Sequence, residues 1–424
     1  MKKIIHTVFK HPLISGSTII FVGSMIANIL SYFFNLAMGR FLLPSDYGVL
    51  ISLISIFNIF SVFSITISTV FTKFSAIFVA QKEEQLIGSL FISGTKWVGI
   101  IAFLIVSLII IFSLQISIFL NIKSAILINI IALSLFFSYL WNLGYGVLQG
   151  MLKFSYLSFM AIFSSLAKLT LGLIFVFLGF KVMGAVSAIF LATVASCILV
   201  LVPLYKFLKI RTNKEFSLKN LRRKLSAYAI PVFLSNIGVT AFIAIDIILV
   251  KHYFDPTVAG QYAAISTMGR SIFFVVAPIG LVLFPLIAQK KEKGESITNT
   301  VLLSIILVGI PSIILSLIYF IFPDLVRSIF YPLDEYKIVG RYLGQFSIFI
   351  LFYAFSYLLN TIYLSIGKVK VCVFTIAGSI LEIILISLFY KDISQVINVM
   401  IISSFSLLIS LLLYYRKAME SYKN

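Results

Sequence analysis

Five charged side chains lie well inside long apolar segments, and they are the residues best placed to do chemistry. Three are cations, Lys96, Lys168 and Arg270, and two are acids, Asp246 and Glu382. A charge near the centre of a bilayer costs about 2.5–3.5 kcal/mol on insertion scales, so such residues face a hydrated cavity or a partner of opposite charge. Because the cations outnumber the acids, we predict a net positive interior suited to an anionic cargo such as a phosphate or pyrophosphate group.

Lys168 and Arg270 are the leading candidates for substrate binding because they lie deepest. At 1.5 Å per residue, Arg270 is about 18 Å into the helix expected over 258–286, and Lys168 is about 15 Å from the end of the helix expected over 154–178. We expect both to face a hydrated cavity. Lys96 lies nearer the membrane surface, where its long side chain can also snorkel to water or pair with an acid.

The two acids admit two roles. Asp246 lies four residues before the outer end of the helix expected over 226–250, where it can meet headgroups or Lys251. Glu382 lies deeper, in the segment 369–389. Either acid can pair with an intramembrane cation or accept a coupling proton, and pairing is the favoured role.

A polar face runs along the first apolar segment. Ser24, Asn28, Ser31 and Asn35 are spaced by four, three and four residues, which places them on one side of a helix. Such a face either packs against another helix or lines water. Asn236 occupies the position equivalent to Ser24 in the seventh segment, and this correspondence favours a shared cavity lined by Asn28, Asn35 and Asn236.

The composition indicates that the apolar segments cross a membrane. Of the 424 residues, 61% are hydrophobic and only 11% are charged, and the mean hydropathy is +1.13. That is too little charge to cover the cores of a soluble protein of this length. We predict an all-α integral membrane protein with twelve spans of about 20 residues or more. The segments are 14–38, 47–72, 89–112, 123–147, 154–178, 182–205, 226–250, 258–286, 297–321, 338–365, 369–389 and 393–415.

The basic residues predict the topology. The chain carries 33 Lys and Arg against 14 Asp and Glu, a formal net charge of +19. With the N-terminus in the cytoplasm, most of the excess falls on the two tails and on the loops after even-numbered helices, whereas the opposite loops are almost balanced. This distribution obeys the positive-inside rule and predicts that both termini are cytoplasmic. Topology thus explains the positive charge without a nucleic-acid partner.

A strongly basic loop divides the chain into two sets of six helices. We predict an N-terminal lobe over 1–205, a cytoplasmic linker over 206–225 and a C-terminal lobe over 226–424. The linker is expected to rest on anionic headgroups, and a regulatory or partner-binding role is the alternative.

The two halves resemble each other. A shift of 212 residues aligns Pro44 with Pro256 and Gly48 with Gly260, each just before or at the start of an even-numbered helix. Repeats with an even number of spans lie parallel in the membrane, related by an axis along its normal. We therefore predict two parallel six-helix lobes around a central cavity.

Motifs for enzymatic chemistry are missing from the sequence. No phosphate-binding G-x-x-x-x-G-K-[ST] loop and no H-E-x-x-H zinc motif occurs. The three histidines, His6, His11 and His252, are too far apart in the sequence for a metal site. We expect no catalytic residues, no metal and no cofactor, so the energy for any transport must come from an ion gradient or from a partner.

One stretch carries a family resemblance. Gly39-Arg40-Phe41-Leu42-Leu43-Pro44-Ser45-Asp46-Tyr47-Gly48 resembles the motif of the polysaccharide biosynthesis (Wzx-type, O-antigen or oligosaccharide-lipid) flippases of the multidrug/oligosaccharidyl-lipid/polysaccharide (MOP) exporter superfamily. In this chain the motif residues are Arg40, Pro44, Asp46 and Gly48. Weaker similarities follow in the same order as in the family, at 148–154, 259–262 and 367–368.

The resemblance implies a fold like that of the MATE and other MOP transporters and a function as a flippase. The implied cargo is an oligosaccharide repeat unit linked to undecaprenyl pyrophosphate. It would be moved by alternating access across the bacterial cytoplasmic membrane for O-antigen, capsule or exopolysaccharide synthesis. A role in lipopolysaccharide assembly would bring membrane lipids, a polysaccharide polymerase and chain-length machinery as partners. Family cavities are lined by Lys and Arg, a role that Lys168 and Arg270 fit by position.

Two other functions remain open. A multidrug exporter of the same fold would use membrane-embedded acids to bind cationic cargo, and the net positive interior argues against it. A membrane polysaccharide polymerase or ligase would need large outside loops, whereas the longest one here, about 322–337, is short. Peptidoglycan-precursor flippases of the same superfamily usually have fourteen spans, so twelve spans argue against that branch.

Overall fold

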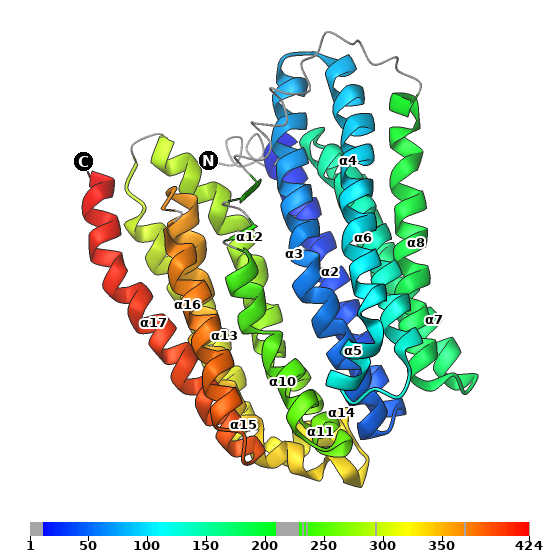
Figure 1. Cartoon of the computed structure of the whole chain (residues 1–424). Coiled ribbons are helices and arrows are strands. Elements are labelled where there is room, and N and C mark those ends of the chain that lie inside the picture. The colour runs from blue at the N-terminus through cyan, green and yellow to red at the C-terminus, as the bar shows by residue number, and fades with distance from the viewer. Residues whose placement is uncertain are drawn as a thin grey trace. The chain divides into compact units, whose positions relative to one another are not determined.

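The structure, a computed structural model of the full chain, consists of helices joined by short turns in the residues that it describes (Figure 1). These are residues 12–208, 229–230, 233–234, 236–292, 295–368 and 370–423. Most of the predicted cytoplasmic linker therefore lies outside the described residues. The long apolar runs form helices because a chain in lipid must satisfy its own backbone hydrogen bonds. Several prolines lie at helix starts, where the missing N–H is tolerated.

Packing divides the chain into two compact units. The first comprises residues up to Phe34 and Phe60–Phe233, and the second comprises Asn35–Ile59 and the chain from Leu234 onward. The boundary thus falls inside two helices, α2 (Pro12–Phe41) and α3 (Pro44–Ala80). The lobe boundaries at 205 and 226 stay a prediction. The sequence analysis did not anticipate that Asn35–Ile59 packs with the second unit.

The first unit is a bundle of long helices. Within it, α6 packs on α4 and α8, and α7 packs on α8. Besides parts of α2 and α3, its helices are α4 (Glu84–Ile111), α5 (Ser113–Phe119), α6 (Ala125–Gly150), α7 (Phe154–Phe177) and α8 (Lys181–Leu208).

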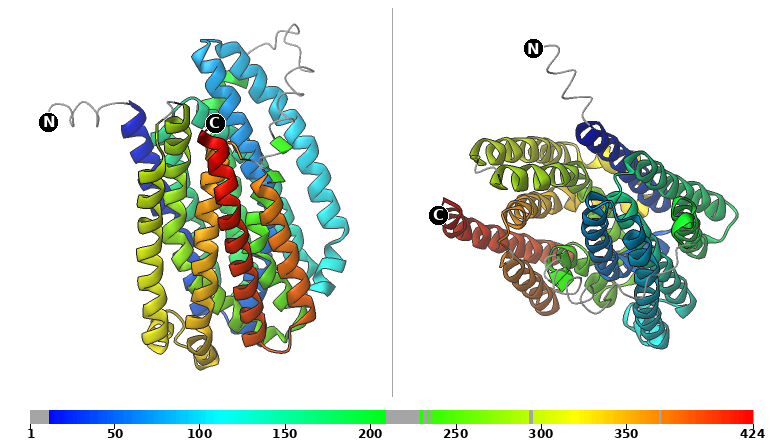
Figure 2. Two further views of the ribbon diagram at one scale, coloured as in Figure 1. Left: turned by 90° about the vertical axis from the view of Figure 1, so that its left-hand side faces the viewer. Right: turned by 90° about the horizontal axis from the view of Figure 1, so that it is seen from above.

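The second unit contains more and shorter helices. Its longest members, α15 and α17, lie side by side, and α13 also packs on α15 (Figure 2). Its helices are α10 (Ile245–Tyr253), α11 (Pro256–Gly269), α12 (Ser271–Glu292), α13 (Thr298–Ile321), α14 (Pro323–Phe330), the 3-10 turn η1 (Asp334–Tyr336), α15 (Lys337–Ser365), α16 (Val371–Leu388) and α17 (Ile393–Lys423).

Two of the predicted spans are not continuous helices. In place of one helix over 226–250, the described residues form Asn236–Phe242 followed by α10, with a bend of 42°. In place of one helix over 258–286, α11 and α12 meet at a second bend of 42°. Ten helices are long and apolar enough to cross a membrane, or up to twelve if each bent pair is one span. The predicted fold class, an all-α membrane protein of about twelve spans, is therefore confirmed for the described part of the chain.

The aligned glycines of the two halves touch each other within the second unit. A Cβ atom placed on Gly260 in α11 would lie 1.7 Å from the carbonyl oxygen of Pro44, and one placed on Gly48 in α3 would lie 2.9 Å from the Gly260 nitrogen. Only glycine allows two helix backbones to approach so closely. The two glycines that match in the repeat thus allow the start of α3, part of the segment Asn35–Ile59, to pack directly on α11.

We expect Gly260→Ala to destabilise the protein. The added methyl group meets a backbone carbonyl that cannot rotate away, and overpacking of this kind typically costs about 1–3 kcal/mol. The matched control is Gly99→Ala in α4, where nothing lies within 4 Å of the new Cβ; this change should be neutral or slightly stabilising because Ala is the better helix former. Thermal unfolding of the two purified full-length variants tests this, and equal unfolding temperatures would contradict the close contact.

Candidate functional site

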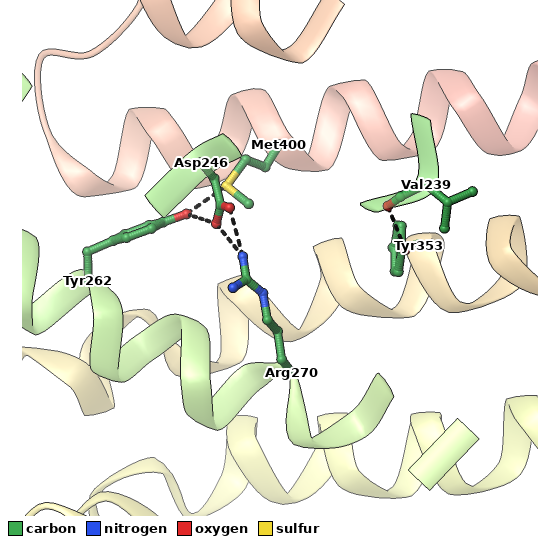
Figure 3. Close-up of polar contacts among 6 residues, drawn as sticks. All are labelled: Val239, Asp246, Tyr262, Arg270, Tyr353 and Met400. Atoms are coloured by element: carbon green, nitrogen blue, oxygen red, sulfur yellow. Dashed lines mark hydrogen bonds and ion pairs between the residues drawn. The ribbon is translucent and has the colours of Figure 1, made fainter. Parts of the chain in front are cut away.

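The second unit holds a buried ion pair at its two helix breaks. Nη2 of Arg270 donates hydrogen bonds to both carboxylate oxygens of Asp246, at 2.7 Å each (Figure 3). The Asp246 side chain is completely buried, and that of Arg270 is 12% exposed. Of the two roles considered for Asp246, the structure therefore places it with a cation, and the partner is Arg270 instead of Lys251.

The helix breaks explain why these two charges are tolerated here. Asp246 lies in the first turn of α10, directly after the first break, and Arg270 is the residue that ends α11 at the second break. A helix N-terminus carries partial positive charge and favours an anion, whereas a C-terminus favours a cation. The field at the start of α10 therefore favours Asp246, whereas Arg270 lies between the C-terminus of α11 and the N-terminus of α12, whose fields oppose each other. Arg270 is stabilised mainly by its ion pair with Asp246.

Two further groups complete the ion-pair cluster. The Tyr262 hydroxyl donates to Oδ2 of Asp246 at 2.7 Å, and Sδ of Met400 lies 2.9 Å from the same hydroxyl oxygen (Figure 3). On the Arg270 side, Nε is buried and has no hydrogen-bond partner among the described residues. The guanidinium is therefore anchored at one nitrogen and retains unused donors.

Glu382 in α16 lies near this cluster but does not join its hydrogen bonds. It is close enough to Asp246 and Arg270 to interact electrostatically with both. Its side chain is fully buried, and neither carboxylate oxygen has a hydrogen-bond partner in the part of the chain that the structure describes. A buried carboxylate without hydrogen bonds is costly, so it needs a proton or another cation to neutralise it.

The first unit holds an intramembrane cation in a different setting. Nζ of Lys168 in α7 donates to Oγ of Ser31 at 3.2 Å and lies 5.1 Å from the centre of the Phe34 ring. Ser31 is also within hydrogen-bond distance, 3.1 Å, of the Ser165 hydroxyl. Among the described residues no carboxylate pairs with Lys168. Hydroxyls and an aromatic face hold this ammonium in place but leave its charge uncompensated.

The remaining predicted cation and the polar residues lie outside these two clusters. Lys96 is exposed on α4, beside the exposed Trp97. Asn28, Asn35 and Asn236 are half-buried. Of the predicted polar face on α2, only Ser31 contacts a candidate cation; Ser24 instead donates to the Ile20 carbonyl of its own helix.

The residues of the loop motif sit at two helix ends. Arg40 lies in the last turn of α2 and Asp46 in the first turn of α3, both with the sign that the helix dipole favours. Pro44 begins α3, and only Leu42 and Leu43 link the two helices. The motif therefore forms a tight helix-to-helix connection whose glycine is required by the contact with Gly260.

Several residues of these sites escaped sequence reasoning. Tyr262, Met400 and Phe34 are ordinary apolar or aromatic residues in the sequence, and only the fold brings them to a charge. Lys251, expected outside the membrane, is buried in α10, 1% exposed, with electrostatic attraction to Asp46 and without a hydrogen-bond partner for Nζ among the described residues. The one signal that was present is Gly269 directly before Arg270, since glycine favours a helix break.

Comparison with known proteins identifies the family. The model of the family described as "Polysaccharide biosynthesis protein" matches residues 13–291, well over half of the chain. The chain belongs to this family. A second model, MatE, matches residues 231–388 of this polysaccharide biosynthesis family member.

An uncharacterised membrane protein of Methanocaldococcus jannaschii is 30% identical over 179 residues, which cover 39% of this chain and 43% of that relative. The chain therefore aligns with less than half the length of this relative.

Solved structures show that the polysaccharide biosynthesis family member has the MOP transporter fold. An inward-facing multidrug resistance MATE transporter of the MOP superfamily superposes with a TM-score of 0.73 at 15% identity, over 95% of this chain and 99% of that one. The lipid II flippase MurJ in an inward closed conformation gives a TM-score of 0.73 at 15% identity, over 95% and 89%. A MOP superfamily transporter from Pyrococcus furiosus gives 0.64 at 17% identity, over 96% of both chains. The protein is thus a multi-pass membrane protein with a transporter fold.

Proposed function

We propose that this protein is a flippase for lipid-linked oligosaccharides. It moves repeat units attached to undecaprenyl pyrophosphate from the inner to the outer leaflet of the bacterial cytoplasmic membrane, for the synthesis of a surface polysaccharide. Membership of the polysaccharide biosynthesis family supports the substrate class. The single structural observation that carries the proposal is Lys168, a cation in a membrane span with no carboxylate partner among the described residues.

Lys168 and Arg270 would then have different tasks. A lysine held only by Ser31 and Phe34 can attract a pyrophosphate, because binding it removes the cost of an uncompensated charge. Arg270 is already paired with Asp246, so its unused donors can add hydrogen bonds without adding net charge. Lys96 and the half-buried Asn28, Asn35 and Asn236 remain candidates for contacts with the sugar or with the lipid.

Glu382 is the better of the two acids for ion coupling. Asp246 already accepts hydrogen bonds from Arg270 and Tyr262, whereas the buried oxygens of Glu382 have no such donors. Binding of a proton or a small cation to Glu382 would also change the field at the Arg270–Asp246 pair. Such a link connects an ion gradient to a group that contacts the substrate.

Deletion of the gene tests the proposed function. The deletion strain should lose surface polysaccharide and accumulate lipid-linked repeat units on the inner leaflet, and the wild-type gene should restore both. Accumulation of unpolymerised units on the outer leaflet would instead indicate a polymerase or ligase and would contradict the flippase. In vesicles, translocation should stop when the ion gradient is dissipated, and Glu382→Gln should make the rate independent of that gradient.

A second candidate function is export of small molecules. The MatE match over 231–388 and the buried acids of the second unit favour it. The two functions are separated by purified protein in vesicles: an exporter should drive efflux of small organic cations, whereas the flippase should translocate a pyrophosphate-linked lipid and leave those cations in place.

A further inference from the structure

One end of the first unit contains a pocket that the transport sites do not use. It has a volume of about 540 Å³ and lies where α3, α6 and α8 end and where α4 and α7 begin. Its lining includes Lys82, Lys153, Lys206, Glu83, Leu148 and Met151. The positive-inside rule predicts that this end lies at the cytoplasmic leaflet. The pocket is far from Lys168 along α7, which begins at Phe154.

The pocket combines a basic mouth with an apolar floor. Its three lysines come from three separate helix ends and face a single described acid, Glu83. The floor is made by side chains that are almost fully buried, including Leu148 and Ile87. Pockets of roughly 300–1,000 Å³ with this division of polar and apolar walls are typical of small-ligand sites. Lysines around such a pocket select an anion, and phosphate is the anion that lysine commonly binds.

The backbone turn after α3 sets where the Lys82 side chain leaves the chain. The turn after α3 is closed by hydrogen bonds from the Glu83 N–H to the Phe78 carbonyl and from the Lys82 N–H to the Val79 carbonyl, both 3.0 Å. This arrangement puts Lys82 at φ 59°, in the left-handed region where glycine is the usual residue. Leu152 after α6 and Lys181 at the start of α8 have the same left-handed backbone, so this geometry is a common feature of the helix ends in this unit and sets the position of Lys82 without assigning it a ligand.

We propose that this pocket binds the phosphate headgroup of an anionic phospholipid. A lipid fits better than free phosphate because apolar side chains are exposed around the mouth. Val79 lines the pocket and is 39% exposed, and Leu152, between the pocket residues Met151 and Lys153, is 51% exposed. Acyl chains can cover this surface while the lysines hold the headgroup, as basic pockets between membrane helices do at the cytoplasmic face. The site is separate from the proposed translocation site.

Lipid binding to the purified full-length protein tests the proposal. In native mass spectrometry from neutral detergent, we expect phosphatidylglycerol to bind in preference to phosphatidylcholine. The variant Lys82→Gly/Lys153→Gln should bind phosphatidylglycerol roughly tenfold more weakly. Its thermal stability should not fall, because glycine relieves the left-handed backbone at position 82. Equal binding of phosphatidylglycerol by the variant and the wild type would overturn the proposal.

The opposite end of the same unit offers a matched control. Lys181 also has a left-handed backbone, with φ 47°, and Lys123 is exposed in the connection before α6. The variant Lys181→Gly/Lys123→Gln makes the same charge change and should keep wild-type binding; an equal loss would show a non-specific charge effect and overturn the assigned pocket. Millimolar inorganic phosphate should not displace the lipid, and full displacement would assign the pocket to free phosphate instead.

Discussion

Charge reversal at Lys168 should abolish translocation while the protein remains folded and abundant. The ammonium is held by Ser31 and the face of Phe34, and among the described residues no acid compensates it. In Lys168→Glu the same position repels a pyrophosphate. Even the neutral Lys168→Met removes a charge-assisted hydrogen bond of about 1.5–3 kcal/mol, or roughly ten- to a hundredfold in substrate affinity. Lys168→Arg should retain partial activity.

The measurement is surface polysaccharide in a deletion strain that expresses each variant at matched abundance. Lys123→Glu is the control for charge reversal, since Lys123 is an exposed lysine between α5 and α6 of the same unit. Normal polysaccharide in Lys168→Glu would remove Lys168 from the proposed binding site. A defect of equal size in Lys123→Glu would show that net charge, and not this position, is responsible.

Breaking the Arg270–Asp246 pair should cost stability, and replacing the whole pair should restore most of it. Arg270→Met leaves Asp246 fully buried without its cation, and removal of one partner of a buried pair typically costs about 3–5 kcal/mol. In Arg270→Met/Asp246→Leu both charges are gone, so most of the lost stability should return, less the cost of the buried Tyr262 hydroxyl, which loses its carboxylate acceptor. Thermal unfolding of the purified single and double variants provides the measurement.

Transport by the double variant separates two roles of Arg270. We expect it to fold but to translocate poorly, because the unused donors of the guanidinium are lost with the charge. A double variant that is both stable and fully active would show that the ion pair serves folding alone. If Arg270→Met were as stable as the wild type, the buried pair would not contribute to stability as the geometry requires.

The further prediction for Lys82 and Lys153 concerns a different part of the molecule. Its outcome is independent of the transport predictions, since phospholipid binding at the pocket and substrate binding at Lys168 involve separate residues of the first unit. A protein that loses one activity and keeps the other would support the separation of the two sites.

The sequence by itself determined the class of protein and the presence of costly charges. Hydropathy is summed along the chain, so the apolar segments and their helical character follow from the order of residues in the sequence, although two of the twelve predicted spans are broken helices. The same reading of the sequence identifies Lys96, Lys168, Arg270, Asp246 and Glu382, because a charge within an apolar segment is recognised without knowing its partner.

The tertiary structure alone decided which of those charges are compensated. Whether Asp246 meets Arg270 depends on two helix breaks and on the packing of α10 against α11, neither of which has a periodic signal in the sequence. Likewise Gly48 and Gly260 align in the repeat, but only packing shows that their backbones touch. Pairing and close contact depend on segments that are far apart in the chain. The sequence therefore identified the charged residues, and the fold showed that Arg270 is neutralised by a carboxylate whereas Lys168 is not.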